Sequence, residues 1–301
     1  MNNKLVSVII PVYNAEFYIQ LALESVSKQT YQELEVIVID DGSTDGTLRI
    51  LETFCDPRIK VISRGNRGLI STLNECIELS SGEYIARMDA DDICYPTRIE
   101  EQIKYLSKNK EIGVLFTGLE YIDAQGKVFK QNASDNYREV LPAELLFGCP
   151  VCHPTAIFNM NVLTKTDILY NNDFKNTEDF ELWTRLISKV RIGILGGILF
   201  QYRVHERSIT SSNNLLQREM AVSALSKNLI NTVSEGIIKK VSIIYNNHQG
   251  SYSNFQTLSA LFFIFLNLKK MNVGFSYNAY VIKSYRLMRK IIFSPARKSL
   301  R

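Results

Sequence analysis

The stretch RMDADD at residues 87–92 directly follows a short apolar segment, EYIA at residues 83–86. Its three carboxylates stand within four residues, where like charges repel each other unless a cation or hydrogen-bond donors compensate. Hard divalent cations prefer such oxygen ligands. A second acidic stretch, IDDGSTDG at residues 39–46, follows another apolar segment. Two acidic strand ends predict a site for a metal and a nucleotide, although either stretch alone could be a helix cap or a solvated loop.

The first 118 residues alternate between apolar strand patterns and amphipathic helix patterns. Strands are expected at residues 5–10, 34–39, 59–62, 83–88 and 114–117, and helices at residues 15–29, 47–54, 69–79 and 96–107. This alternation predicts an α/β, Rossmann-like fold with a mostly parallel central sheet and helices on both faces. Ligands of open α/β sheets bind at the carboxyl ends of the strands, where both acidic stretches stand.

Charge divides the 301-residue chain, which is 46% hydrophobic and can bury a large core. Residues 212–301 hold 13 Lys and Arg against 2 Asp and Glu, or +11, and residues 1–211 hold 22 against 29, or −7. We therefore predict one domain at 1–211, with halves at 1–118 and 119–211, and a helical basic region at 212–301. The longest apolar run, residues 258–266, is far shorter than the roughly 20 residues of a membrane span.

Two polar constellations in the second half are further site candidates. Glu178 and Asp179 open a helix pattern, so they suit an N-terminal cap, a catalytic base, or both. His205 ends the strand pattern that leads into YRVH at residues 202–205, and it is interpreted as a metal or phosphate contact rather than a surface residue. Asn66 precedes Gly68 after the third strand, where glycine lets the backbone approach a nucleotide closely.

Five motifs in this order closely resemble glycosyltransferase family 2. They are SVIIPVYN at 7–14, DDGSTD at 40–45, DADD at 89–92, EDFELW at 178–183 and YRVH at 202–205. The resemblance covers about residues 4–210. It implies a GT-A fold and the transfer of a sugar, with inversion, from a nucleotide diphosphate donor.

Residue roles follow from the matching positions. Together with Asn66, the nucleotide-binding residues expected are Pro11, Tyr13, Asn14, Asp41, Asp89, Asp91 and Arg203. The resemblance implies that Asp91, with Asp89 and His205 close by, holds Mn²⁺ or Mg²⁺. It makes Asp179 the catalytic base, with Glu178 beside it. Glu101 lies near the acidic stretch in sequence and is a further catalytic candidate, or else part of a solvated helix face.

The segment from Arg87 to Gln102 is similar to β-1,3-glucosyl- and galactosyltransferases that extend GlcNAc- or GalNAc-diphospho-undecaprenol in O-antigen or capsule assembly. This similarity implies a UDP-sugar donor, glucose or galactose favoured, and a polyprenol-diphosphate-linked sugar acceptor. Another donor sugar, such as GlcNAc or rhamnose, and a later acceptor in the repeat unit stay open.

The basic end predicts peripheral attachment to the anionic cytoplasmic face of the bacterial inner membrane. Its basic residues are Lys269, Lys270, Lys283, Arg286, Arg289, Lys290, Arg297, Lys298 and Arg301. Aromatic residues interleave with them, at Phe262, Phe263, Phe265, Tyr280, Tyr285 and Phe293. The alternative is a helical cap on the first domain, with its charges in solvent.

Two other classes of protein fit less well. A dinucleotide-dependent oxidoreductase would carry G-x-G-x-x-G after the first strand, where PVYN stands at residues 11–14. A non-catalytic protein that binds nucleic acid or membrane through its basic end would leave the acidic motifs without a role. We therefore expect no nucleic-acid partner.

Overall fold

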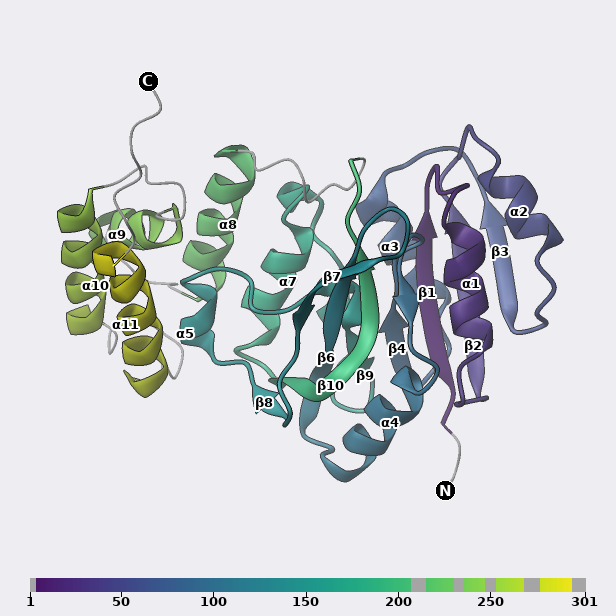
Figure 1. Cartoon of the computed structure of the whole chain (residues 1–301), viewed down its shortest axis with the longest axis horizontal. Helices are drawn as coiled ribbons and strands as arrows, with labels where there is room; N and C mark the ends of the chain where they lie inside the picture. The colour runs from purple at the N-terminus through teal and green to yellow at the C-terminus, as the bar shows by residue number, and fades with distance from the viewer. Residues whose placement is uncertain (1–3, 207–214, 230–234, 247–252, 268–276, 294–301) are drawn as a thin grey trace. The chain divides into compact units, whose positions relative to one another are not determined.

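The computed structural model describes residues 4–206, 215–229, 235–246, 253–267 and 277–293 (Figure 1). The chain divides into two compact units. The first comprises residues 1–139, 151–182 and 190–212, and the second residues 140–150, 183–189 and 213–301. The predicted boundary between residues 211 and 212 lies outside the described residues, so that division stays a prediction.

The first unit is built on a ten-stranded sheet with the order β3-β2-β1-β4-β9-β6-β10-β5, in which β7 also pairs with β6 and β8 with β10. Its strands are β1 (Val6–Val12), β2 (Leu34–Asp40), β3 (Ile59–Ser63), β4 (Tyr84–Arg87), β5 (Ile93–Cys94), β6 (Ile112–Ile122), β7 (Val128–Asn132), β8 (Arg138–Glu139), β9 (Ile157–Asn159) and β10 (Arg191–Arg203). The pairs β1–β2, β1–β4 and β2–β3 are parallel, as predicted for the first 118 residues.

Beyond β4 the sheet is mixed. The short strand β9 runs antiparallel to both β4 and β6, and β10 runs parallel to β6. Two reversals restore the original direction, so β4, β6 and β10 all point the same way. The carboxyl ends of β1, β2, β4 and β10 therefore meet at one edge of the sheet, which is where ligands of α/β proteins bind.

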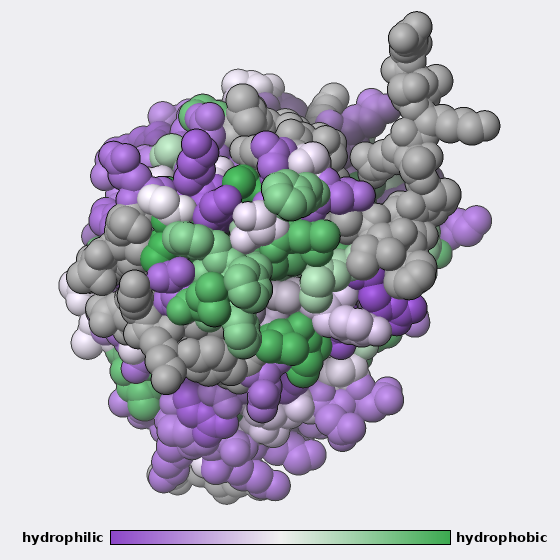
Figure 2. All heavy atoms as spheres, turned by 90° about the vertical axis from the view of Figure 1, so that its left-hand side faces the viewer, coloured by the Kyte–Doolittle hydropathy of each residue, from purple (hydrophilic) through white to green (hydrophobic). Residues whose placement is uncertain are grey.

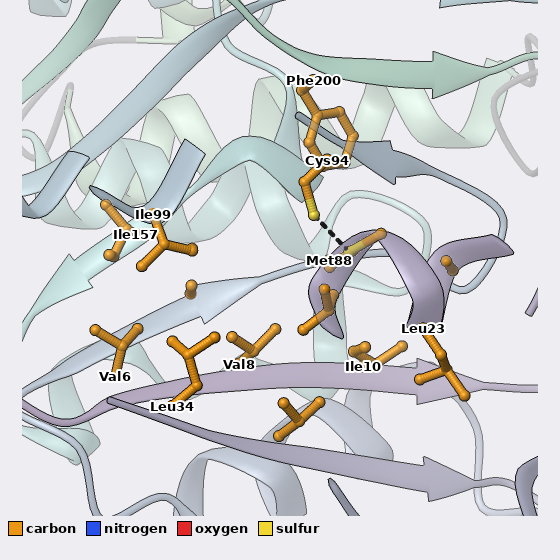
Figure 3. Close-up of a cluster of buried hydrophobic side chains, with 14 of the residues drawn as sticks. Val6, Val8, Ile10, Leu23, Leu34, Met88, Cys94, Ile99, Ile157 and Phe200 are labelled. Carbon is orange, nitrogen blue, oxygen red and sulfur yellow. Dashed lines mark hydrogen bonds between the residues drawn. The ribbon is translucent and has the colours of Figure 1, made fainter. Parts of the chain in front are cut away.

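Helices cover both faces of the sheet, which confirms the predicted α/β architecture. Helices α1 (Ile19–Ser27), α2 (Thr47–Thr53) and α4 (Arg98–Lys108) share a core with Val6, Val8 and Ile10 of β1. Figure 3 shows this core, in which the Cys94 thiol lies 3.2 Å from the Met88 sulfur. Helix α3 (Leu69–Leu79) packs on β1 and β2 outside this core, on the opposite face, because side chains alternate along a strand.

The connections of the second half are short helical turns. They are α5 (Pro142–Leu145), η1 (His153–Thr155), α6 (Lys165–Ile168), η2 (Asn172–Phe174) and the longer α7 (Glu178–Leu186).

The second unit is helical, as predicted for the basic region. Its longer helices are α8 (Leu215–Asn228), α9 (Glu235–Asn246), α10 (Asn254–Asn267) and α11 (Tyr277–Phe293). Tyr280 of α11 is 1% exposed and donates to the carbonyl of Leu261 in α10 at 2.9 Å. Its ring also packs against Phe147 and Phe265. Across the described residues, no helix combines the length and apolar character that crossing a membrane requires.

A buried arginine ties the end of β4 to the segment that leads into β9. Arg98 is fully buried, and its Nη2 donates to the carbonyls of Arg87 at 2.8 Å and Pro154 at 3.0 Å. Its Nε donates to Gln102 at 3.2 Å, and the guanidinium lies 4.8 Å from the ring of Phe200. Burial lowers the pKa of Arg98, so these acceptors must stabilise the buried cation.

We expect Arg98→Met to destabilise the fold by about 3 kcal/mol, because it leaves buried carbonyls without their donor. Urea unfolding followed by circular dichroism measures this. The matched control is Lys104→Met on the same helix, since Lys104 is 58% exposed and makes only a surface ion pair with Glu101. Its effect should stay within about 0.5 kcal/mol. Equal effects of the two substitutions would contradict the role of Arg98.

Candidate active site

The loops that follow β1 and β2 are hydrogen-bonded to each other at the carboxyl edge of the sheet. The backbone N–H of Asn14 donates to Ser43 Oγ at 2.9 Å, and Thr44 N–H donates to Asn14 Oδ1 at 2.8 Å. Asn14 has φ of +49°, a left-handed conformation that asparagine tolerates well. Pro11 is buried within β1, whereas Tyr13 is 52% exposed at this edge. Asn14 therefore shapes the edge, and Tyr13 offers it an accessible aromatic ring.

Asp41 holds the loop after β3 against the loop after β2. Its carboxylate is 4% exposed, accepts from the N–H groups of Arg67 at 2.8 Å and Gly68 at 2.9 Å, and pairs with Arg64. Asn66 is exposed in the loop that these bonds hold. The bonds favour a loop-positioning role for Asp41, and its contact with a nucleotide stays a prediction.

Three carboxylates converge after β4. One oxygen each of Asp89, Asp91 and Asp92 lies within 4.8 Å of the others. Asp92 was not among the ligands predicted from the sequence. It is 1% exposed, its Oδ1 accepts from the Arg203 N–H at 2.8 Å, and its Oδ2 is buried with no hydrogen-bond partner in the described part of the chain.

The carboxylates of this cluster repel one another, so a bound cation would stabilise them. Burial raises the pKa of Asp92 well above its ordinary value, and the charges of Asp91 and Asp89 raise it further. Burial also raises the pKa of Asp89 to about 6, although Arg87 opposes the rise. Convergent oxygen ligands with one buried, unpaired oxygen fit a hard divalent cation, so the residues present suit the predicted Mn²⁺ or Mg²⁺.

The end of β10 brings His205 to the cluster. His205 Nε2 lies 2.9 Å from Asp91 Oδ2, and its ring lies 5.1 Å from that of Tyr18. Arg203 is 2% exposed, and its guanidinium donates to the backbone carbonyls of Asp91 at 2.8 Å and Asp123 at 3.1 Å. Its bonds favour a role in positioning Asp91, whereas its direct contact with a nucleotide stays a prediction.

Arg87 links the cluster to the start of α7. It is 3% exposed and binds Asp89 through two bonds, Nη2 to Oδ1 at 2.5 Å and Nη1 to Oδ2 at 2.7 Å. Its charge also lowers the pKa of both Glu178 and Asp179, against the larger effect of burial. Arg87 was not predicted as a site residue, although its position just before the three aspartates could have indicated that it pairs with one of them.

Glu178 and Asp179 are carboxyl groups with raised pKa values beside this cluster. Burial and the charge of Asp179 raise the pKa of Glu178 to about 7, and its Oε2 is buried and unpaired among the described residues. Burial raises the pKa of Asp179 too, while its Oδ1 accepts from the Phe180 N–H at 2.7 Å. Asp179 in turn raises the pKa of Asp89, so the start of α7 acts electrostatically on the cluster. Such shifts are typical of acid–base residues.

Two other candidates have structural surroundings. Glu101 is 42% exposed and pairs with Lys104 at 3.6 Å on the surface of α4, which favours the solvated helix face. His153 is buried, with Nε2 2.6 Å from the hydroxyl of Tyr170, and burial lowers its pKa well below the ordinary value. A neutral, hydrogen-bonded imidazole fits a structural role for His153.

Comparison with solved structures agrees with this fold. TarS residues 1–349 from S. aureus, solved with UDP-GlcNAc, align with a TM-score of 0.65 and 21% identity over 96% of this chain and 81% of that one. The mannosyltransferase PcManGT from Pyrobaculum calidifontis, solved with GDP-Man and Mn²⁺, aligns with a TM-score of 0.60 and 18% identity over 95% and 81%. The chain therefore has the GT-A fold that the sequence predicted.

The sequence comparisons identify the family. Residues 7–165 match the model of glycosyl transferase family 2. An uncharacterised glycosyltransferase of Haemophilus influenzae is 35% identical over 294 residues, which cover 90% of this chain and 89% of the relative. The chain belongs to glycosyl transferase family 2, and its activity is that of a glycosyltransferase.

The raised pKa of Glu178 predicts a pH-dependent cost to stability. Its folded pKa of about 7 lies above the ordinary 4.5, so the ionised form destabilises the fold above pH 7 and costs nothing below pH 4.5. Glu178→Gln should therefore stabilise the metal-free protein by about 3 kcal/mol at pH 8 and have little effect at pH 4.5. Urea unfolding at both pH values measures this, with the exposed Glu52→Gln as control. A gain of equal size at both pH values would show that packing, not charge, is responsible.

Proposed function

We propose that this glycosyltransferase is a metal-dependent, inverting enzyme that moves glucose or galactose from a UDP-sugar to a polyprenol-diphosphate-linked GlcNAc or GalNAc. The observation that carries the proposal is the convergence of Asp89, Asp91, Asp92 and His205 at the strand edge beside the carboxyl groups of Glu178 and Asp179 on α7. The cluster of three aspartates and His205 suits a diphosphate and its metal. The carboxyl groups at the start of α7 suit the removal of a proton.

The donor nucleotide is proposed to bind over the carboxyl ends of β1 and β2. Tyr13 is exposed there and suits stacking against a base. Asn14 and Asp41 hold the surrounding loops through the hydrogen bonds described above, and Asn66 is exposed on the adjacent loop. The chain's own hydrogen bonds hold these loops to each other, which lowers the entropic cost of ordering them on donor binding.

Asp91, Asp89 and His205 are the proposed metal ligands, and Asp92 joins them through its buried, unpaired oxygen. A bound divalent cation would spread the negative charge of the departing diphosphate. Arg203 supports the set indirectly, because it fixes the backbone carbonyl of Asp91 and donates its N–H to Asp92. Arg87 holds Asp89 through two bonds, so its carboxylate keeps one orientation.

Asp179 is the proposed general base that takes the proton from the acceptor hydroxyl as this oxygen attacks the sugar carbon. In an inverting reaction, the acceptor oxygen attacks on the face of the sugar ring opposite the departing diphosphate. One base on the side of the acceptor is therefore required to take the hydroxyl proton. Burial raises the pKa of Asp179 toward the working pH, which favours proton transfer, and Arg87 keeps it from rising further. Glu178 is next in line, whereas the surface position of Glu101 on α4 counts against it.

The lipid-linked acceptor and the attachment to the cytoplasmic face of the inner membrane are proposals that rest on the similarity of residues 87–102 and on the charge of +11 in residues 212–301. Transfer of GlcNAc is the second candidate for the donor, since TarS was solved with UDP-GlcNAc. Transfer to a later acceptor in a repeat unit is the second candidate for the acceptor. Family membership sets aside the oxidoreductase alternative.

The proposal predicts turnover of UDP-glucose or UDP-galactose on GlcNAc-diphospho-lipid in the presence of Mn²⁺. Excess EDTA should abolish it, and Asp91→Asn should lose most activity and weaken Mn²⁺ binding in calorimetry while circular dichroism stays unchanged. A panel of UDP-sugars with UDP release as readout makes the test. Turnover of UDP-GlcNAc alone would replace the proposed donor, and full activity in EDTA would disprove the metal requirement.

Replacement of the base should affect chemistry and spare binding. Asp179→Asn should slow the chemical step by about 10²–10⁴-fold and leave the affinity for UDP within a few-fold of the parent. Single-turnover kinetics and UDP titration separate the two effects. Glu101→Gln is the control and should keep near-normal turnover. An inactive Glu101→Gln beside an active Asp179→Asn would reverse the assignment.

A further inference from the structure

Helix α10 is apolar on its outer as well as its inner face. Its residues, NFQTLSALFFIFLN, include no charged side chain. Thr257, Ala260, Leu261 and Ile264 form the buried side. On the other side, Phe255 is 80% exposed, Phe262 66% and Leu266 62%, at the seven- and four-residue spacings that align side chains along one stripe. A surface helix normally carries polar residues on this stripe.

Helix α11 lies beside α10 through Tyr280 and continues the apolar surface. Val281, Ile282 and Tyr285 are between 47% and 57% exposed. One turn further on, the exposed residues become arginines, Arg286 and Arg289. The outer face of α11 therefore changes from apolar to basic along its length.

Helices α10 and α11 are in contact, and each leaves apolar side chains exposed. Figure 2 views the molecule from the side on which these helices lie in Figure 1, and apolar side chains gather at the centre of that face. Contiguous apolar surface of this kind on a soluble protein marks an interaction site. We call the set Phe255, Phe262, Leu266, Val281, Ile282 and Tyr285 the apolar patch.

Charge decides which partner suits the patch. Residues 212–301 carry +11, so a second copy of the chain would bring like charges together. An anionic bilayer instead attracts basic residues and accepts apolar side chains at its interface. Lys269, Lys270, Arg297, Lys298 and Arg301 add to this charge but lie outside the described residues, as do the side chains of Lys290 and Phe293.

We propose that the outer faces of α10 and α11 dock the protein on an anionic membrane, with the apolar patch in the interface and Arg286 and Arg289 against headgroup phosphates. The inference deepens the proposed function, because a lipid-linked acceptor requires an enzyme at the bilayer surface. Docking itself needs neither donor nor acceptor. It can therefore be tested apart from activity.

The structure refines which basic residues belong to the surface. Lys283 Nζ lies 3.3 Å from Glu144 and its side chain is only 27% exposed. Reversing its charge would set two carboxylates against each other and disturb the unit. Arg286 and Arg289 are exposed, so their replacement tests the surface without that complication.

Flotation with vesicles tests the docking. The full chain should bind vesicles that contain phosphatidylglycerol and should bind pure phosphatidylcholine at least tenfold more weakly. Replacing Phe255, Phe262 and Leu266 together with Ser should weaken binding to the anionic vesicles at least tenfold, and so should Arg286→Glu with Arg289→Glu. The control triple, Leu21→Ser, Phe129→Ser and Val162→Ser, removes exposed apolar residues of the first unit and should bind like the parent.

Insertion of the patch has a direct spectroscopic readout. The chain has one tryptophan, Trp183, which is 1% exposed and gives a constant background. A Phe262→Trp variant should show a blue-shifted emission when anionic vesicles are added, whereas Leu21→Trp should not. A blue shift of equal size at both positions would overturn the proposed docking face.

Three further results would overturn the proposal. They are absence of vesicle binding by the parent, unchanged binding by the serine triple, and a concentration-dependent dimer that the serine triple abolishes while vesicles stay unbound. In the last case the patch is an interface between copies of the chain. Turnover of a short-chain, water-soluble acceptor should survive in the serine triple. If the parent shows no turnover on any acceptor yet binds vesicles as described, the proposed function fails and the docking surface stands.

Discussion

The site depends on the ion pair between the buried Arg87 and the half-buried Asp89. Five carboxyl groups, those of Asp89, Asp91, Asp92, Glu178 and Asp179, act on one another within this region, and ionised carboxylates repel and resist burial. Arg87 opposes the resulting rise in pKa at four of them. Arg98 is also buried, and it donates to the backbone carbonyl of Arg87. Arg98 therefore positions Arg87, and Arg87 positions the carboxylate of Asp89.

One buried cation does not neutralise this much negative charge. The pKa of Asp89 is about 6 and that of Glu178 about 7 in spite of Arg87, so both carboxyl groups still bind a proton readily near neutral pH. The excess negative charge lowers the stability of the fold, but it also makes these carboxyl groups better at binding a cation or a proton. In the proposed mechanism, a divalent cation would offset the negative charge at the cluster, and the proton of the acceptor hydroxyl would offset it at α7. The same charge excess would then favour both of the proposed events.

Local patterns in the sequence were sufficient for the parallel half of the sheet and for the positions of both acidic stretches. They missed β9, because three residues are too few for a periodic signal, and with it the antiparallel pairings that turn β10 toward the site. The closeness of His205 to Asp91 depends on those reversals. The hydrogen bonds that Asp41 and Arg203 make to backbone groups could not be predicted from the motifs either. A motif specifies which group is present, but only the fold determines which backbone atoms occupy its hydrogen-bonding capacity.

The hydrogen-bond partners divide the polar residues of this site into two kinds, those that hold loops in place and those with an oxygen still available. Asp41 accepts from backbone N–H groups and Arg203 donates to backbone carbonyls, so both hold loops of the site in place, and their contacts with a nucleotide stay predictions. Asp92 and Glu178 each keep a buried oxygen that no described protein group satisfies. An unsatisfied buried oxygen is unfavourable in a folded protein and persists where the surrounding framework is rigid enough to maintain it. The hydrogen bonds of Asp41 and Arg203 to the backbone thus help to explain how the carboxyl groups of Asp92 and Glu178 are held in position for the proposed metal and acceptor.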